Sequence, residues 1–315
     1  PACPLMHGPG CMTQLIVLAG GGSVVTLDSP GLEPETLLDT IEREKVNMIA
    51  IVGDAFGKPI LRALDAEPDR WDLSSLIVLT SSGVMFSESV KQALLKHLPT
   101  AMIVDAFSSS EALGMGQSVS SAGGSSGTAK FVTGENTRVV DEAGVDVEPG
   151  SGQIGRVAVG GFQPVGYYKD EAKTAATFLT IGRRRYSVPG DFAQVEADGS
   201  ITLLGRGSVC INTGGEKVFP EEVEEALKTH PSVNDAVAVG VPDEKFGEAI
   251  TGVVELSPDA ALDEAGLIAH VKDQLASFKA PKRVLAIDTI GRAPNGKVDY
   301  KRLKRFAIDT LGIDA

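Results

Sequence analysis

Two segments of the sequence place a charged side chain beside glycines, where it could bind a ribose or a phosphate. Asp191 follows Gly190 at the end of a strand-like stretch, and a carboxylate there can accept both hydrogen bonds of a ribose diol. Arg206 lies between Gly205 and Gly207, and its planar guanidinium can donate to phosphate or ribose oxygens. Taken singly, Asp191 is better explained as an ordinary turn aspartate, and a solvated arginine is the alternative for Arg206.

Two later segments have the same character. Gly214 and Gly215 would let a ligand chain pass close to the backbone, because glycine has no side chain. Lys297 follows Gly296 on a turn near the C-terminus, and its ammonium is a mobile positive charge for a phosphate or carboxylate oxygen. A surface lysine after a turn is the alternative for this segment alone.

Together, and in this order, the segments resemble the adenylate-forming (AMP-binding) superfamily, which includes acyl-CoA synthetases, luciferases and adenylation domains of peptide synthetases. The Gly-Asp and Gly-Arg pairs, the stretch from Gly215 to Glu224 and the C-terminal Gly-Lys pair match motifs of that family. Its Tyr-Gly-x-Thr-Glu loop is similar to the segment that ends at Glu111, where Phe107, Ser108 and Ser110 replace the tyrosine, glycine and threonine.

The resemblance implies ATP, Mg²⁺ and CoA as ligands and a role for each position. Lys297, Glu111 and Ser110 are expected to act in catalysis, and Glu111 to hold the metal. The residues expected to bind the nucleotide are Ser82, Gly83, Asp105, Phe107, Ser110, Asp191 and Arg206. The residues expected at CoA are Gly214, Gly215 and Glu216, the one expected in the acyl pocket is His7, and those expected at a hinge are Arg206, Gly207, Ser208 and Val209. The C-terminal domain would swing about this hinge between two half-reactions.

The activity implied by the resemblance is the activation of a carboxylic acid by ATP to acyl-AMP, followed by transfer of the acyl group to CoA. The stretch from Gly205 to Val218 is most similar to actinobacterial fatty-acyl and steroid-acid CoA ligases. An acyl-AMP ligase or an adenylation domain that loads a carrier protein is an alternative, as is a nucleotide-binding fragment without turnover. A cytoplasmic location is expected, and a homodimer is left open.

The sequence departs from the family pattern in two ways. Val209 stands where the hinge usually has an aspartate or a lysine. The family's Ser/Thr/Gly-rich phosphate loop would precede His7, close to the first residue, Pro1. We therefore expect the chain to correspond to about the C-terminal three fifths of a typical member and to be poor or inactive in catalysis alone.

The hydrophobic pattern predicts the elements that would position these residues. Short apolar strands, including 24–27, 48–52, 76–79 and 101–104, alternate with helical stretches, which indicates βαβ units and a parallel sheet. We expect an α/β subdomain over residues 1–130, a barrel-like β subdomain over 131–205 and a small hinged α+β domain over 206–315. Ligands of parallel sheets bind at the carboxyl ends of the strands, so the loops around Ser82 and from Asp105 to Glu111 should form the site.

The composition excludes several other classes of protein. Of the 315 residues, 43% are hydrophobic and 23% charged, so disorder, collagen and coiled coil do not fit. The net charge of −13 argues against non-specific nucleic-acid binding, and no apolar run is long enough to span a membrane. Cys3, His7 and Cys11 are spaced like metal ligands, but the glycines and prolines between them argue against a helix and no fourth ligand is nearby. We expect no metal site there.

Overall fold

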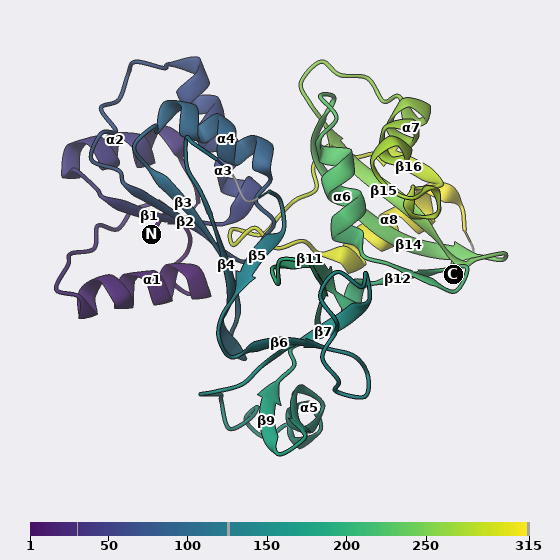
Figure 1. Ribbon diagram of the computed structural model, residues 1–315. Helices are drawn as coiled ribbons and strands as arrows, with labels where there is room; N and C mark the ends of the chain where they lie inside the picture. The colour runs from purple at the N-terminus through teal and green to yellow at the C-terminus, as the bar shows by residue number, and fades with distance from the viewer. Residues whose placement is uncertain (30, 125–126, 314–315) are drawn as a thin grey trace. The chain divides into compact units, whose positions relative to one another are not determined.

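The computed structural model describes residues 1–29, 31–124 and 127–313, and the chain divides into two compact units (Figure 1). The first unit consists of Pro1–Pro189, Ala193–Leu203 and Ala293–Lys297. The second consists of Gly190–Phe192, Leu204–Arg292 and Val298–Ala315. None of the helices in the described ranges has the length and hydropathy that crossing a membrane requires.

The first unit begins with the predicted parallel sheet. Strands β1 (Met48–Ile51), β2 (Val78–Ser81) and β3 (Met102–Ser109) pair in parallel, and helices α2 (Pro34–Glu44), α3 (Gly53–Ala66) and α4 (Glu88–His97) pack with them around one apolar core (Figure 1). Ile51 pairs with Ser81 and Ser81 with Asp105, so β1 and β2 end beside Asp105, beyond which β3 continues to Ser109. The α/β fold class is confirmed.

Two expectations for the N-terminal residues are wrong, namely the strand over 24–27 and the absence of a helix between Cys3 and Cys11. No strand forms over 24–27, and helix α1 (Gly8–Ala19) contains the apolar run that precedes it. Pro9 is tolerated because the first-turn N–H groups of a helix have no partner within the helix. Met12, Leu15, Ile16 and Leu18 of this helix are exposed.

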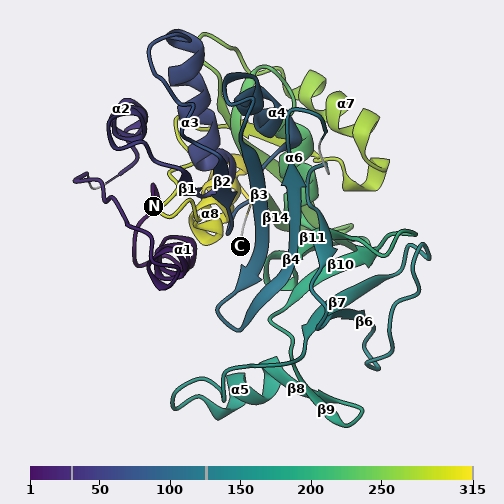
Figure 2. The ribbon, with the colours of Figure 1, turned by 60° about the vertical axis from the view of Figure 1, so that its left-hand side comes forward.

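The segment from Asp105 to Glu111 is a β-hairpin rather than a loop. β3 continues to Ser109, β4 (Ala112–Ser120) returns antiparallel to it, and Ser109 pairs with Ala112 across the turn. Figure 2 shows the two as long neighbouring strands. Ser110 and Glu111 therefore lie at the tip of a hairpin, which is a more rigid position than a loop would give.

The remaining strands of this sheet belong to the first unit, except for residues 191–192 and 204–206 at the ends of two of them, which belong to the second. They are β5 (Lys130–Thr133), β6 (Thr137–Val140), β7 (Ile154–Val159), β8 (Phe178–Ile181), β9 (Arg184–Ser187), β10 (Asp191–Val195) and β11 (Ile201–Arg206), and α5 (Glu171–Thr177) precedes β8. The strand order is β1-β2-β3-β4-β5-β11-β10-β7-β9-β8, with β6 beside β7. These strands curve around a second core but do not close into a barrel within the described residues.

The second unit is a five-stranded sheet with helices on both faces. Its elements are η1 (Gly207–Val209), β12 (Ile211–Thr213), β13 (Glu216–Val218), α6 (Pro220–Lys228), β14 (Val233–Asp243), β15 (Gly247–Leu256), α7 (Glu264–Gln274), η2 (Ser277–Lys279), β16 (Arg283–Ala286) and α8 (Tyr300–Leu311). Successive side chains of a strand point to opposite faces. Ala236 and Ala238 of β14 accordingly pack with α6 and α7, and Val237 and Val239 with α8.

Candidate active site

The hairpin turn between β3 and β4 presents Ser110 and Glu111. Ser110 is exposed and Glu111 half-buried. The Oγ of Ser108 accepts a hydrogen bond from the N–H of Gly114 at 3.1 Å, and that of Ser109 accepts one from the N–H of Ala112 at 3.2 Å. These bonds fix the turn, so the Glu111 carboxylate is carried on a rigid support.

The loop after β2 brings two of the predicted residues together. Ser82 is half-buried, and Gly83 has a φ of +95°, a backbone conformation that glycine adopts at no steric cost. A Cβ at position 83 would lie 3.1 Å from Cε1 of His7. Gly83 therefore permits close approach of the His7 ring to the loop expected to bind adenine.

Lys297 lies in the same unit as His7 and Gly83. The loop Ala293–Lys297 belongs to the first unit, and Gly296 within it is buried. A Cβ at position 296 would lie 2.9 Å from Cγ1 of Val52, so the loop packs closely there. Burial, and then the positive charge of Lys297, hold the pKa of His7 below its usual value of 6.5. The imidazole is therefore neutral at pH 7, and the Lys297 ammonium is exposed beside it.

The side chains of Asp105 and Phe107 point into the core from β3. Phe107 packs against Phe131, with ring centroids 5.6 Å apart. Asp105 forms an ion pair with Lys91 of α4, with 3.2 Å between Oδ2 and Nζ, and both side chains are buried. Burial raises the pKa of Asp105 to about 6 against the opposing effect of Lys91. Their predicted nucleotide contacts stay predictions, and in this structure both residues support the hairpin from within.

Asp54 is a second buried carboxylate that the sequence did not single out. Its Oδ1 accepts hydrogen bonds from the backbone N–H and the hydroxyl of Ser87, at 2.9 and 3.0 Å. The adjacent Gly53 N–H donates to Ser81 Oγ at 2.9 Å. These bonds hold both ends of the loop that contains Ser82 and Gly83. No signal in the sequence pointed to this carboxylate, because its hydrogen bonds join residues 33 positions apart.

The second unit brings Asp191 and Arg206 together as the resemblance implies. Arg206 Nε lies 3.2 Å from Asp191 Oδ1, and the Asp191 side chain is 7% exposed whereas that of Arg206 is 54% exposed. The Gly207 N–H also donates to the carbonyl of Gly190 at 3.0 Å. The two side chains are therefore held within reach of one small polar ligand.

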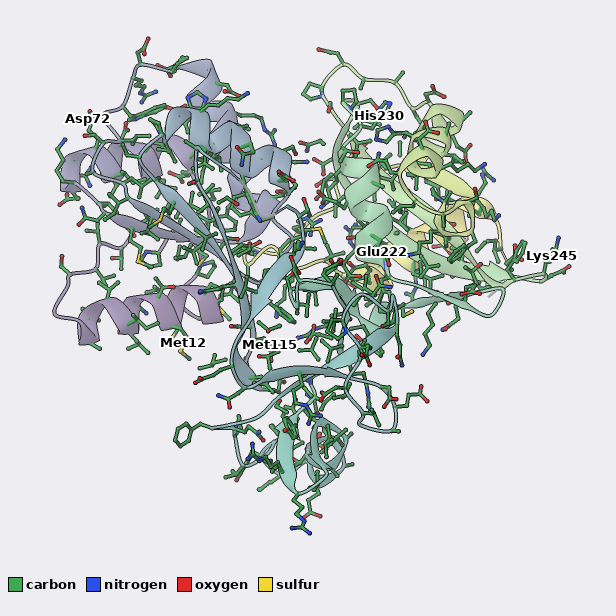
Figure 3. All side chains as sticks on the ribbon, in the orientation of Figure 1. Met12, Asp72, Met115, Glu222, His230 and Lys245 are labelled. Carbon is green, nitrogen blue, oxygen red and sulfur yellow. The ribbon has the colours of Figure 1, made fainter. Side chains whose placement is uncertain are left out.

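The expected hinge and CoA-binding residues come next in the chain, after Arg206. Gly207, Ser208 and Val209 form one 3₁₀ turn between β11 and β12. Gly214 and Gly215 form the two-residue turn of the β12–β13 hairpin, in which Thr213 pairs with Glu216. The β14–β15 hairpin lies beside this turn, with Lys245 at its tip (Figure 3), because Thr213 also pairs with Gly247.

Comparison with known proteins identifies the family. The family model described as AMP-binding enzyme matches residues 2–168, and the model of the AMP-binding enzyme C-terminal domain matches residues 222–297. The chain belongs to the AMP-binding enzyme family. Two curated relatives show how similar the sequence is and how much of each chain the similarity covers.

A medium/long-chain-fatty-acid and 3-oxocholest-4-en-26-oate CoA ligase of Mycolicibacterium smegmatis is 44% identical over 308 residues, covering 96% of this chain and 56% of the relative. A 3-oxocholest-4-en-26-oate CoA ligase of Rhodococcus rhodochrous is 44% identical over 320 residues, covering 99% of this chain and 56% of the relative. The chain thus spans about half the length of the curated relatives it matches.

Solved structures of AMP-binding enzymes share the fold. The amide bond synthetase McbA of Marinactinospora thermotolerans has a TM-score of 0.83 and 25% identity, over 96% of this chain and 60% of that one. The anthranilate CoA ligase AuaEII in complex with anthranoyl-AMP has a TM-score of 0.82 and 23% identity, over 99% of this chain and 60% of that one.

The residues of this AMP-binding enzyme fit a magnesium ion that is bound together with nucleotide. Among the described residues no three His, Cys, Asp or Glu side chains form a metal cluster, so Cys3, His7 and Cys11 do not form one. Mg²⁺ is usually held by one or two carboxylates together with substrate phosphates rather than by a protein cage. A single hairpin carboxylate, Glu111, is a donor of that kind.

Glu221 of the AMP-binding enzyme gives a pH-dependent prediction for the region of Arg206. Burial, then Glu224, raises its pKa to about 8, although the Arg206 N–H donates to its Oε1 at 3.4 Å. The stability that this group contributes is full below pH 4.5 and is lost as the pH rises through 8. The glutamine of Glu221→Gln does not titrate, so its free energy of unfolding should not fall over this range. Relative to wild type, the free energy of unfolding of Glu221→Gln should therefore rise by more than about 1 kcal/mol between pH 5 and pH 8.5, as measured by urea unfolding.

The exposed Glu244 supplies the matched control for this measurement. Glu244→Gln should show the pH dependence of wild type. The same pH dependence in Glu221→Gln and Glu244→Gln would contradict a proton held on Glu221.

Proposed function

We propose that the protein carrying this chain is an ATP-dependent acyl-CoA ligase. The observation that carries the proposal is the meeting of Lys297, His7 and Gly83 in one unit. It supports a site in which the loop expected to bind adenine, a neutral imidazole and a mobile cation face the same reacting group. The relatives at 44% identity support the same activity.

The proposed reaction has two steps. A carboxylate oxygen of the acid attacks the α-phosphorus of ATP, the bond to the β-phosphate oxygen breaks, and acyl-AMP and pyrophosphate form. The CoA thiol, losing its proton, then attacks the acyl carbon, and AMP leaves with the bridging oxygen. Positioning and charge neutralisation supply most of the barrier lowering in such transfers.

Six of the predicted side chains have a proposed role in the first step. Lys297 neutralises negative charge shared by the acid and the α-phosphate, and Ser110 donates a hydrogen bond to that phosphate. His7 bounds the acid-binding region as a neutral ring, so it adds no second positive charge. Asp191 and Arg206 hold the ribose. Glu111 would hold Mg²⁺, which would supply positive charge to the phosphates.

CoA is the proposed acceptor of the second step. The turn of Gly214 and Gly215 offers backbone without side chains to the pantetheine arm, beside Glu216. Phe246 lies against Gly214, and the ammonium groups of Lys245 and Lys282 lie 5.1 and 5.2 Å from the centre of its ring. Two cations at this position suit the phosphates of CoA. A rotation about Arg206–Val209 would move Lys297 away from the reacting group and bring the turn of Gly214 and Gly215 to it.

The proposed acids are fatty acids and steroid acids with a side-chain carboxylate. The printed names of the M. smegmatis and R. rhodochrous relatives include such acids, and the identity to both is 44%. The cytoplasmic location stays a prediction, to be tested by cell fractionation, and light scattering would decide the oligomeric state, which stays open.

Assays with CoA as the sole acceptor test the proposal. The protein that carries this chain, with ATP, Mg²⁺ and a panel of fatty and steroid acids, should release AMP and form acyl-CoA in equal amounts. Acyl-AMP that accumulates with CoA present and reacts only with a carrier protein would favour the adenylation-domain alternative. Nucleotide binding without pyrophosphate release for any acid would favour a protein without turnover.

A further inference from the structure

Tyr167 contacts the proposed magnesium carboxylate directly. Its phenolic O–H donates to Oε1 of Glu111 at 2.5 Å, between residues 56 positions apart in the chain. We propose that Tyr167 is a positioning residue that orients Glu111 toward the metal of Mg·ATP. This inference rests on the proposed function.

The backbone around Tyr167 is fixed by bonds of its own segment. The Tyr167 N–H donates to Oγ1 of Thr174 at 2.8 Å, and that hydroxyl donates to the carbonyl of Asp170 at 2.7 Å. The Asp170 carboxylate caps α5 through the N–H of Lys173 at 2.9 Å. A helix cap and a hydroxyl bridge thus set the position of Tyr167 before its side chain reaches the hairpin.

The ring of Tyr167 is also held on more than one side. The Lys173 ammonium lies 4.0 Å from the ring centre, and the ring of Phe178 lies 6.0 Å away at an interplanar angle of 49°. Cation–π and tilted aromatic contacts of this kind each stabilise an arrangement modestly. Because the ring is restrained, the hydroxyl has little freedom except toward Glu111.

A restrained hydroxyl changes what the carboxylate can do. A carboxylate has about four acceptor positions on two oxygens, so one short hydrogen bond orients it and leaves capacity for a cation. A bond from O–H to a charged carboxylate is among the stronger hydrogen bonds of proteins. Partners that orient metal-binding carboxylates typically change metal affinity or activity by about 10- to 100-fold when removed.

The alternative is that Tyr167 only packs the segment before α5. The two readings separate in Tyr167→Phe, which keeps the ring and its contacts with Lys173 and Phe178 and removes only the O–H. If Tyr167 only packs, any defect of Tyr167→Phe should be the same with and without magnesium. Orientation of Glu111 predicts a defect confined to magnesium-dependent binding.

The matched control is the adjacent tyrosine. Tyr168 is 87% exposed, and Lys169 lies 5.2 Å from its ring centre. Tyr168→Phe removes the same O–H one position along the chain and should leave every measurement unchanged.

The experiment is calorimetric titration of the protein that carries this chain. ATP binding is measured over a series of Mg²⁺ concentrations, and AMP binding is measured in EDTA. Tyr167→Phe should raise the half-saturating Mg²⁺ concentration by about 10- to 100-fold and leave AMP affinity in EDTA unchanged. In Glu111→Gln, the further Tyr167→Phe change should have no additional effect, because the carboxylate that Tyr167 orients is gone.

Each other outcome overturns the inference in a recognisable way. An unchanged half-saturating Mg²⁺ concentration in Tyr167→Phe, with normal magnesium dependence in wild type, refutes the role of Tyr167 and leaves the proposed function intact. Nucleotide binding by wild type that ignores Mg²⁺ refutes the metal assignment as well. An equal loss of AMP and Mg·ATP affinity, or a further loss in the Glu111→Gln background, shows a packing role.

Discussion

Lys297→Ala should lower acyl-AMP formation by about 100- to 1,000-fold, the usual effect of removing one group that stabilises developing charge. Thioester formation from supplied acyl-AMP and CoA should be nearly unchanged, because the bond to the α-phosphate already exists. The physical reason is that the loop that carries Lys297 lies in the same unit as His7, whose pKa is lowered first by burial and then by the charge of Lys297. Pyrophosphate release measures the first step, and acyl-CoA formation the second.

Lys301 provides the control for the Lys297 measurement. It is an exposed lysine on α8, four positions further along the chain, and Lys301→Ala removes the same charge from the protein as a whole. Both half-reactions should keep their wild-type rates in this variant. An equal loss of both half-reactions in Lys297→Ala would remove Lys297 from its proposed role.

Breaking the buried pair of Lys91 and Asp105 should cost about 3–5 kcal/mol of the free energy of unfolding. The Lys91 side chain has no exposed surface, and Asp105 is the partner of its ammonium at 3.2 Å. Asp105→Asn leaves that ammonium buried without its counter-charge, and Lys91→Met leaves the carboxylate buried. Because the cost is that of an uncompensated charge, the double variant should lose less than the sum of the two, as measured by guanidinium unfolding.

The exposed pair of Lys130 and Asp198 is the matched control. Its charged atoms lie 3.3 Å apart, nearly the same distance, but its side chains are 40% and 62% exposed. Lys130→Met should therefore cost less than about 1 kcal/mol. Similar losses in Lys91→Met and Lys130→Met would contradict a buried ion pair beneath the hairpin.

The raised pKa of Asp105 fixes the sign of a pH effect on this pair. Because its folded-state pKa is about 6, above the ordinary 3.8, its contribution to stability is full below pH 3.8 and is lost as the pH rises through 6. Removing Lys91 removes the cation that offsets the ionised form. The loss in Lys91→Met should therefore be larger at pH 8 than at pH 5.

The sequence predicted the elements in which one periodicity dominates. Leu37, Leu38 and Ile41 recur at helical spacing and form the buried face of α2. Pro220, with Glu221 and Glu222 behind it, begins α6 as the helix dipole favours. Local chemistry settles the structure at both places, so no knowledge of the rest of the chain was needed.

Elements whose structure depends on distant partners were missed. The apolar run from Leu15 to Ala19 cannot distinguish strand from helix by pattern, and it ends α1. Gly114 and Gly116 weaken the strand signal of β4, which forms because β3 and β5 lie on either side of it. Tertiary pairing decided both segments.

The site shows the same division. Motif order predicts Glu111, Asp191, Arg206 and Lys297 as site residues, but it could not show which side chains orient them. Tyr167 was not among the residues that the motifs predicted, and its bond to Glu111 exists because the fold brings together residues 56 positions apart. Motifs predict the groups expected to touch ligands, whereas the side chains that contact those groups depend on the fold.

Oxygen-18 tracing tests the activation of the acid as acyl-AMP most directly. The acid is labelled in its carboxylate and supplied with unlabelled ATP, Mg²⁺ and CoA to the protein that carries this chain. Because AMP would leave with the oxygen that bridged it to the acyl carbon, one labelled oxygen should appear in AMP for each acyl-CoA formed. Label in pyrophosphate or inorganic phosphate, or AMP without label, would contradict an acyl-AMP intermediate.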